Sequence, residues 1–278
     1  MASPLIFASM GGLLSERSGV MNIALEGFML MGAFSAAAGA HYTGNPYLGL
    51  LIGALAAGFT ALIHAFWCIT LRGDQIVAGT AINLLGIGVP AFLLQRLFGT
   101  VGRSPTVERL PSITSGLNIL VPVAFLLVPT IWYFLYRTKP GLRVLAAGEQ
   151  PRAAESVGVA VDRYRYGCVL ASGILAGIGG AFLSIGDLSL FTNGMTNGRG
   201  FIALAALVFG NWMPLGTLGA ALFFGAAQAV QIQSQAVGLP VSKELIIALP
   251  YLLTLIALTG VVRNSTPPAG LGKHATAD

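Results

Sequence analysis

Long apolar runs separated by short polar breaks are the feature that most constrains the fold of this chain. Hydrophobic residues make up 55% of the sequence and charged residues 9%, whereas a soluble domain carries roughly a quarter charged residues. Such runs suit helices that cross a bilayer, because a helix satisfies its backbone hydrogen bonds internally. The runs are continuous rather than alternating, which disfavours a transmembrane β-barrel. The sequence therefore predicts an all-α, polytopic helical membrane protein.

The longer apolar runs predict membrane spans, and two shorter runs bring the expected total to about eight to ten transmembrane helices. The shorter runs, Ser3–Leu14 and Gly200–Gly210, fall below the length that crosses roughly 30 Å of hydrocarbon. Ser3–Leu14 is either a re-entrant half-helix or the end of a longer span, and Gly200–Gly210 is taken to cross. The expected spans are Val20–Ala40, Tyr47–Leu71, Gln75–Phe98, Asn118–Tyr136, Gly167–Ile185, Leu215–Val230 and Leu245–Val262.

Glycine content and charge placement fit this class. The 37 glycines are spread through the apolar runs, as in bundles whose helices pack closely in a membrane. The net charge of +5 does not indicate nucleic acid, since the basic residues lie at loop edges, as the positive-inside rule describes. Cys68 and Cys168 are expected as small buried side chains, and His64 as a packing residue. A cleavable signal peptide with a basic first region is not recognisable.

Arg137–Tyr166 is the longest polar interval, and it holds six of the fifteen basic residues. A bilayer core does not accommodate that density of charge, so the interval is expected to lie in water. Glu149–Val157 is predicted to form a short helix within it, with Pro151 in the first turn and Gly158 placed to end it. A small helix on such a loop is a surface that a partner subunit could push on.

One membrane domain, residues 1–278, is expected, with the loop 137–166 between a first half, 1–136, and a second half, 167–262. The tail, 263–278, is polar and rich in Pro and Gly, so it is expected to be disordered. Placing the loop in the cytoplasm puts ten basic residues inside and five outside, which the positive-inside rule favours. The same orientation puts the C-terminus in the cytoplasm.

The two halves resemble each other loosely, since each combines an apolar piece, a polar break and a run of small residues, as around Glu16–Asn22 and Asn197–Phe201. Broken helices at matching places in two halves point to a substrate path near the midplane. Asn22 and Glu26 stand four residues apart and are expected on one helix face. Glu26 then faces a bundle interior or a wet path. The alternative is that Glu26 lies near the membrane edge and either caps or pairs with Arg17.

A polar but uncharged solute would be bound better by amide side chains than by charged groups. For each candidate, the alternative is a structural role in which the side chain satisfies neighbouring backbone groups. No phosphate-binding loop of the G-x-x-x-x-G-K-[ST] type occurs, so any ATP hydrolysis linked to this chain must come from a partner. No metal-ligand cluster or nucleophile motif indicates an enzyme, and no cofactor or metal is expected. The predicted substrate-path residues are Asn22, Glu26, Asn83, Asn193 and Asn197.

Several motifs, in order along the chain, resemble those of one family, the permease subunits of ATP-binding-cassette (ABC) importers for simple sugars and nucleosides. The opening motif is Pro4–Gly32 (PLIFASMGGLLSERSGVMNIALEGFMLMG), and Gln75–Leu84 (QIVAGTAINL) resembles the next signature. Gly141–Val159 (GLRVLAAGEQPRAAESVGV) resembles the cytoplasmic loop that docks on the ATPase. Gly198–Pro214 and Leu249–Val261 resemble later motifs. The resemblance covers nearly the whole chain, although family members usually carry further residues before the position of Pro4.

The resemblance implies a multi-pass subunit of an importer in the bacterial plasma (inner) membrane. Its implied partners are an ABC ATPase subunit, a second permease subunit that is identical or different, an extracytoplasmic solute-binding protein and membrane lipid, without nucleic acid. ATP binding would close the ATPase pair, and the loop helix would pass that motion to two membrane halves that rock about a central path. Without the resemblance, the same loop residues are ordinary solvated positions. The implied coupling residues are Gly148, Glu149, Arg152, Ala153, Ala154, Glu155 and Gly158.

The opening motif favours a nucleoside as the cargo through resemblance alone, with ribose- or galactose-type sugars and branched-chain amino acids as alternatives. A different class of protein is a secondary transporter driven by an ion gradient, with Glu26 and Asp187 as its ion-coupled carboxylates. Two such acids give that class little support, and an ion-driven mechanism assigns no role to the central loop. A membrane enzyme is disfavoured because the three histidines are scattered.

Overall fold

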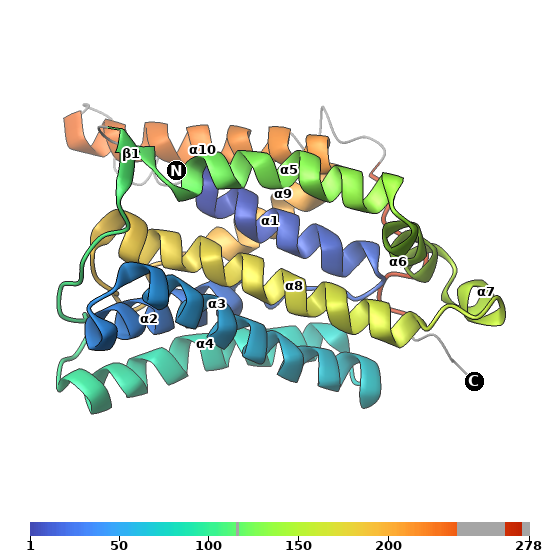
Figure 1. Cartoon of the computed structure of the whole chain (residues 1–278), viewed down its shortest axis with the longest axis horizontal. Helices are drawn as coiled ribbons and strands as arrows, with labels where there is room; N and C mark the ends of the chain where they lie inside the picture. The colour runs from blue at the N-terminus through green and yellow to red at the C-terminus, as the bar shows by residue number, and fades with distance from the viewer. Residues whose placement is uncertain (115–116, 238–264, 274–278) are drawn as a thin grey trace.

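Helices account for almost all regular structure in the computed structural model, which describes residues 1–114, 117–237 and 265–273. A short hairpin pairs β1, Ser112–Thr114, with antiparallel β2, Leu117–Asn118. The helices α3 and α8 continue into π-helical turns, Phe66–Thr70 and Phe182–Leu188. The α-helices of the described residues (Figure 1) are α1, Ala2–Arg17; α2, Leu25–Thr43; α3, Pro46–Ala65; α4, Gln75–Phe98; α5, Leu120–Arg137; α6, Lys139–Glu149; α7, Pro151–Ser156; α8, Val161–Ala181; α9, Arg199–Phe209; and α10, Pro214–Val237.

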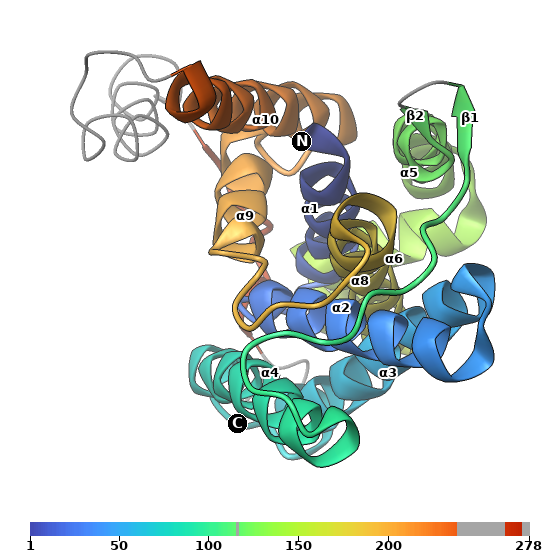
Figure 2. The same cartoon turned by 90° about the vertical axis from the view of Figure 1, so that its left-hand side faces the viewer.

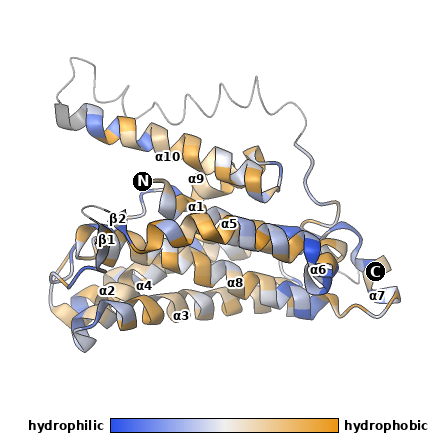
Figure 3. Cartoon of the chain, turned by 45° about the horizontal axis from the view of Figure 1, so that its top comes forward, coloured by the Kyte–Doolittle hydropathy of each residue, from blue (hydrophilic) through white to orange (hydrophobic). Residues whose placement is uncertain are grey.

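Within the described residues, five helices are long and apolar enough to cross a membrane. Their outer faces carry exposed apolar side chains such as Phe59, Leu84 and Phe92, which suits contact with lipid. Figure 3 shows apolar residues along the helices and hydrophilic residues gathered around α6. The chain is a polytopic helical membrane protein, as predicted, and the expected span Leu245–Val262 lies outside the described residues. The five helices are Pro46–Thr70, Gln75–Phe98, Leu120–Arg137, Val161–Leu188 and Pro214–Ser234.

α1 forms the centre of the bundle. Every residue from Ser3 to Glu16 is buried, so this helix is enclosed around its whole circumference rather than along one stripe. It packs against α5, α8, α9 and α10, and Figure 2 shows it in the middle of these helices. The helix extends beyond the expected run Ser3–Leu14, because the polar residues that follow are buried in protein.

Glycines bring α2, α3 and α8 into close contact. A Cβ added at Gly32 of α2 would collide with the backbone of Gly177 in α8. A Cβ added at Gly53 of α3 would lie 2.6 Å from the carbonyl oxygen of Gly32. In a membrane, helices gain from such close backbone approach because lipid offers little hydrophobic driving force for their association. The expected packing through small residues is confirmed at this three-helix contact.

α2 begins at Leu25, so the expected helix from Val20 is wrong over its first residues. The irregular segment before α2 contains Gly19 with a φ of +96°, a conformation that favours glycine. α2 then runs toward the end of the bundle that carries the loop between α4 and α5. There the Tyr42 hydroxyl donates to the carbonyl oxygen of Leu97 at 3.3 Å.

A second interrupted helical stretch lies between α8 and α10. Residues 189–198 form no helix, and the 11 residues of α9 reach only about 16 Å. α9 alone is therefore too short for roughly 30 Å of hydrocarbon, and the expected crossing of Gly200–Gly210 needs the irregular segment before it. That segment starts beside the α4–α5 loop, where the Ser104 N–H donates to the Phe191 carbonyl oxygen at 2.8 Å.

The central polar interval forms two helices, α6 and α7, where one was expected. Glu149 ends α6 and Pro151 begins α7, so the predicted helix Glu149–Val157 is wrong at its start. A residue before proline is pushed out of the helical region, and Gln150 accordingly has a φ of −139°. Gly158 follows the end of α7, as predicted, with a φ of +82°.

α8 starts at Val161, inside the interval that was expected to lie in water. The side chain of Arg165 is only 2% exposed, and its Nε donates to the carbonyl oxygen of Ser18 at 3.2 Å. The expectation of water around the whole interval is therefore wrong at Arg165. A backbone oxygen takes the place of water at Nε, whereas Nη2 is buried without a hydrogen-bond partner among the described residues.

The tail packs against the α6 end of the molecule, where a disordered segment 263–278 was expected. The N–H of Gly270 donates to the carbonyl oxygen of Gly148 at 2.8 Å, and the N–H of Gly272 donates to that of Gly19 at 3.0 Å. Pro268 is buried as well. Residues 265–273 are thus part of the folded structure at this end, contrary to the expectation.

The glycine contact gives a first prediction. We expect Gly32→Leu to lower the free energy of unfolding by about 1–3 kcal/mol, because the added side chain would collide with the α8 backbone and force α2 away from α8. The matched control is Gly88→Leu, at an exposed glycine of α4 where an added Cβ meets nothing within 4 Å. Thermal unfolding in detergent compares the two variants, and equal melting temperatures would contradict the packing of these helices.

Candidate functional site at the junction of two interrupted helices

Glu26 lies in the first turn of α2 and is 6% exposed. Its Oε1 accepts from the Thr196 hydroxyl at 2.5 Å and from the Gly198 N–H at 2.9 Å. Its Oε2 accepts from the Gly200 N–H at 2.7 Å. These donors surround the start of α9, at Arg199, where backbone N–H groups have no partner within the helix. The carboxylate therefore caps α9 and faces the positive end of its dipole.

The junction joins two helices that run to opposite ends of the bundle. α2 runs from Glu26 toward the α4–α5 loop. α9 runs from the same carboxylate toward the α6 end, where the turn after it meets Arg17 through the carbonyl oxygen of Trp212. The α2 and α9 N-termini thus meet inside the bundle. Two interrupted helical stretches are present here, before Leu25 and before Arg199, whereas the predicted repeat of two halves stays a prediction.

Side chains of α4 satisfy the backbone at the start of α2. Asn83 Oδ1 accepts from the Gly27 N–H at 2.8 Å, and Asn83 Nδ2 donates to the Ile23 carbonyl oxygen at 2.9 Å. Gln75 Oε1 accepts from the Met21 N–H at 2.7 Å. Irregular backbone at membrane depth persists where protein groups replace the missing helical bonds, and Asn83 and Gln75 provide such groups.

Asn22 is fully buried, and its Nδ2 donates to the Ser172 hydroxyl of α8 at 2.7 Å. It precedes α2, so the expectation that it shares a helix face with Glu26 is wrong. The side-chain carbonyl oxygen of Asn22 is buried and has no hydrogen-bond partner among the described residues. An unfilled acceptor of this kind is uncommon in a folded interior and suits water or a solute donor.

The two remaining amides of the predicted path lie in the irregular segment before α9. Both Asn193 and Asn197 are exposed. The Asn193 N–H donates to the Gly102 carbonyl oxygen at 2.9 Å, which fixes it at the end with the α4–α5 loop. Asn197 has a φ of +46° and stands directly between Thr196 and Gly198, the two residues bonded to Glu26 Oε1.

A second polar cluster, which the sequence did not predict, connects α1 with the α6 end. Glu16 Oε2 accepts from the Trp212 indole N–H at 2.6 Å. Arg17 Nε donates to the Trp212 carbonyl oxygen at 2.8 Å, and its Nη1 lies 3.3 Å from Glu149 Oε1. Because Arg17 pairs with Glu149, the expected alternative is wrong in pairing Glu26 with Arg17, whereas the capping role that it also named for Glu26 is present at α9. Only the polar break around Glu16 hinted at this cluster.

The predicted coupling residues divide into an outer and an inner set. Glu149, Arg152, Ala153 and Gly158 are exposed at the end of the molecule. Ala154 is buried in a small cluster with Ala147 and Val161, Gly148 is buried and Glu155 is intermediate. The outer face of α7 is the part that a partner can touch.

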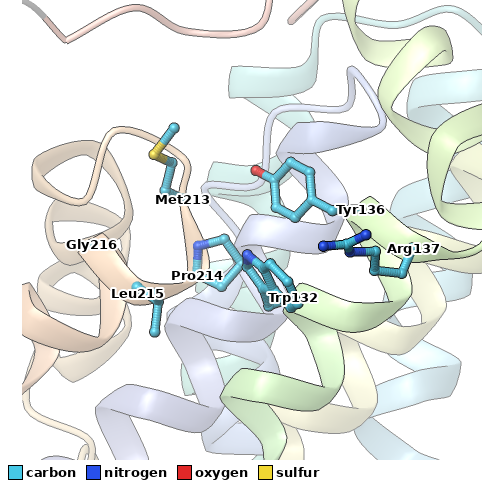
Figure 4. Close-up of a pocket in the computed structure, with 7 residues that line it drawn as sticks. All are labelled: Trp132, Tyr136, Arg137, Met213, Pro214, Leu215 and Gly216. Carbon is cyan, nitrogen blue, oxygen red and sulfur yellow. The ribbon is translucent and has the colours of Figure 1, made fainter.

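A hollow of about 430 Å³ opens between α5 and the start of α10 (Figure 4). Arg137 lies above the Trp132 ring at 5.7 Å from its centroid, and Met213 and Leu215 line the opposite wall. Aromatic and basic side chains gather in this way at membrane–water interfaces. Asn22, Glu26 and Asn83 do not line this hollow, so it is distinct from the junction.

His64 packs inside the bundle, as expected. It is fully buried, its ring lies edge-on to Phe28, and the Cys68 sulfur lies 3.6 Å from its Nε2. Across the described ranges, no group of three or more His, Cys, Asp or Glu residues is placed to hold a metal ion.

The junction gives a second prediction. Glu26→Gln keeps the side-chain shape but sets an amide NH₂ against backbone or hydroxyl donors, so we expect a loss of about 1.5–3 kcal/mol in the free energy of unfolding. Glu108→Gln is the control, because Glu108 is exposed in the α4–α5 loop. Thermal unfolding of both variants in detergent measures the effect. Indistinguishable melting temperatures would show that Glu26 does not hold α9.

Comparison with known proteins supplies the family. The model of a family described as "Branched-chain amino acid transport system / permease component" matches residues 1–258. A guanosine ABC transporter permease protein of Bacillus subtilis is 38% identical over 296 residues, covering 98% of this chain and 92% of the relative. A nucleoside ABC transporter permease protein of Lactococcus lactis is 35% identical over 298 residues, with coverage of 98% and 92%.

A second guanosine ABC transporter permease protein of Bacillus subtilis is 23% identical over 241 residues, covering 80% of this chain and 69% of the relative. No solved structure matches the chain. The family match spans most of the chain, and two relatives exceed 30% identity over nearly its full length. The chain therefore belongs to this family of transport-system permease components, the non-enzymatic membrane subunits of ABC transporters.

Proposed function

We propose that this chain forms half of the translocation path of an ATP-driven importer whose cargo is a nucleoside. The observation that carries the proposal is the similarity, over 98% of the chain, to a guanosine permease and a nucleoside permease. Simple sugars are the second choice of cargo, because they share the neutral, hydroxyl-rich chemistry that amide side chains suit. Branched-chain amino acids, which the family description names, carry charged ends and fit the exposed amides less well.

The substrate path is proposed to run past the junction of α2 and α9. Among the predicted path residues, Asn197 and Asn193 have exposed side chains. The buried side-chain oxygen of Asn22 has no hydrogen-bond partner among the described residues. Glu26 and Asn83 use their polar atoms on backbone groups, which supports a positioning role for both rather than direct contact with the cargo. Their task is to hold irregular backbone at the depth where the cargo passes.

The outer face of α7 is proposed as the docking surface for the separate ATPase. Arg152 and Ala153 are exposed there, and Glu149 beside them pairs with Arg17 of α1. Motion of α7 therefore has a direct route into the central helix of the bundle. Rigid helices that rock against each other would turn this motion into alternating access.

The α6 end is proposed to face the cytoplasm of the cell. Arg17, Arg143, Arg152 and Lys273 lie at or beside the α6 and α7 surfaces, and positive charge favours the cytoplasmic side. The solute-binding protein would then dock at the opposite end, on the α4–α5 loop and the irregular segment before α9. The isolated bridge between Arg103 and Thr192 joins these two segments into one surface.

The second permease subunit is proposed to be a different chain. This protein resembles one guanosine permease of Bacillus subtilis at 38% identity and another from the same organism at 23%. Two unlike permease proteins for guanosine in one organism support a heterodimer more than a homodimer. A membrane lipid annulus would cover the exposed apolar faces of α3 and α4.

An ion-driven secondary transporter is the rival class. Its proposed carboxylates lie in different surroundings, because Glu26 caps α9 inside the bundle whereas the exposed Asp187 stands near the α4–α5 loop. Glu26 also already accepts three hydrogen bonds. A carboxylate that is engaged in capping a helix gives little support to ion coupling.

The third prediction tests the driving force. Proteoliposomes that contain this chain, its partner permease and the ATPase, with the binding protein and labelled guanosine, should accumulate label only with ATP. A proton or sodium gradient without ATP should give no accumulation, because the proposed source of energy is ATP hydrolysis by the partner, this chain having no phosphate-binding loop of its own. Competition by unlabelled ribose or leucine then ranks the cargoes. Gradient-driven accumulation without ATP would favour the rival class.

The fourth prediction tests the docking face. Ala153→Trp should lower recovery of the ATPase with the permease by about tenfold or more. A bulky ring on the exposed face of α7 would keep the ATPase from close contact without disturbing the bundle. Ala153→Ser at the same position is the control and should behave as the wild type does. Ala154 is unsuitable for this test because it packs inward against Ala147. Equal ATPase recovery from both variants would remove α7 from the docking surface.

A further inference from the structure

The described part of the tail, residues 265–273, first contacts the far end of the half-helix α9. The Ser265 hydroxyl donates to the carbonyl oxygen of Val208, in the last turn of α9, at 3.2 Å. The Thr266 N–H donates to the Asn211 side-chain oxygen at 2.9 Å, in the turn between α9 and α10. The tail is thereby attached to the end of α9 opposite to the end that Glu26 caps.

The tail then crosses to α6 and the turn after α1. The Ala269 N–H donates to Glu149 Oε2 at 3.1 Å, and the N–H groups of Gly270 and Gly272 donate to the carbonyl oxygens of Gly148 and Gly19. A Cβ added at Gly270 would lie 2.7 Å from the Gly148 carbonyl oxygen and 2.9 Å from Pro151 Cδ. Only a glycine allows the tail to lie this close.

The outer side of the tail shares a hollow with α7. This hollow, of about 580 Å³, is lined on one side by Glu149, Arg152 and Ala153 and on the other by Ala269 and Lys273. Figure 1 shows the tail, drawn in red, beside α6 at the same end of the molecule as α7. A protein that grips the outer face of α7 therefore also meets the tail.

We propose that residues 265–273 form the second half of the ATPase docking surface and tie that surface to the half-helix α9. The inference rests on the proposed function, in which the ATPase docks on α7. Arg17 is one connector, through its bonds to Glu149 and to the Trp212 carbonyl oxygen. The tail is a parallel connector between the same two places, α6 and the end of α9. Together they make α9 move with the docked ATPase.

Two shortened chains test the tail directly in the complete complex with its partner permease and ATPase. A chain that ends at Asn264 lacks every tail contact, whereas a chain that ends at Lys273 keeps them all. We expect the shorter chain to recover about tenfold less ATPase, or lower still, and to lose ATP-driven uptake. The chain that ends at Lys273 should match the full chain. Equal ATPase recovery and uptake from both would overturn the inference.

A labelling measurement keeps the test independent of whether the shorter chain folds. Both native cysteines, Cys68 and Cys168, are buried, so a polar maleimide would report on an introduced thiol. We expect the ATPase to slow labelling of Lys273→Cys in the otherwise full chain by about tenfold, and to leave Thr100→Cys, at the opposite end, unchanged. Undiminished labelling at Lys273→Cys in a complex that contains the ATPase would overturn the tail inference alone. Failure of the full chain to bind an ATPase would overturn the proposed function as well.

Discussion

The hydrogen-bonding requirement of backbone groups inside a bilayer is the constraint on which this structure depends. An unsatisfied N–H or carbonyl group in hydrocarbon costs several kcal/mol, about as much as a large share of a protein's total stability. Two crossings of this bundle are nevertheless broken, before α2 and before α9. Glu26 resolves the conflict for α9, and Asn83 resolves it for α2. Glu26 and Asn83 are thus explained first by the backbone groups they satisfy.

The same arrangement gives α9 a defined connection at each end. One end is held at the junction by a carboxylate, and the other meets Arg17 and the tail beside α6. A short helix fixed at two places transmits displacement, because packed interfaces shift between discrete arrangements rather than deforming continuously. In the proposed importer, closure of the ATPase pair would reach the cargo path through this element. The close glycine contacts of α2, α3 and α8 would keep the surrounding bundle rigid.

The sequence predicted the bounds of a helix correctly where local residues alone determine them. The apolar run Gln75–Phe98 became α4 with the predicted bounds, since the N-cap Asp74 and the C-terminal Gly99 mark its ends. Local sequence patterns gave wrong predictions where hydrogen bonds from residues distant in the sequence determine the backbone conformation. Asn22 was predicted to be helical because it lies in the largely apolar run Val20–Ala40, but Asn83 and Gln75, more than fifty residues away, satisfy the backbone there outside a helix. The tail and the Arg17–Glu149 pair escaped prediction for the same reason.

Hydrogen exchange at the amides of Gly198 and Gly200, with the protein in lipid nanodiscs, tests the junction most directly. If Glu26 accepts from both groups inside the bundle, these amides will exchange as slowly as those in the middle of α8. Exchange as fast as that of the exposed loop residues Thr100 and Val101 would contradict it. In that case the N-terminus of α9 would be open to water, and no carboxylate would hold the two interrupted helices together.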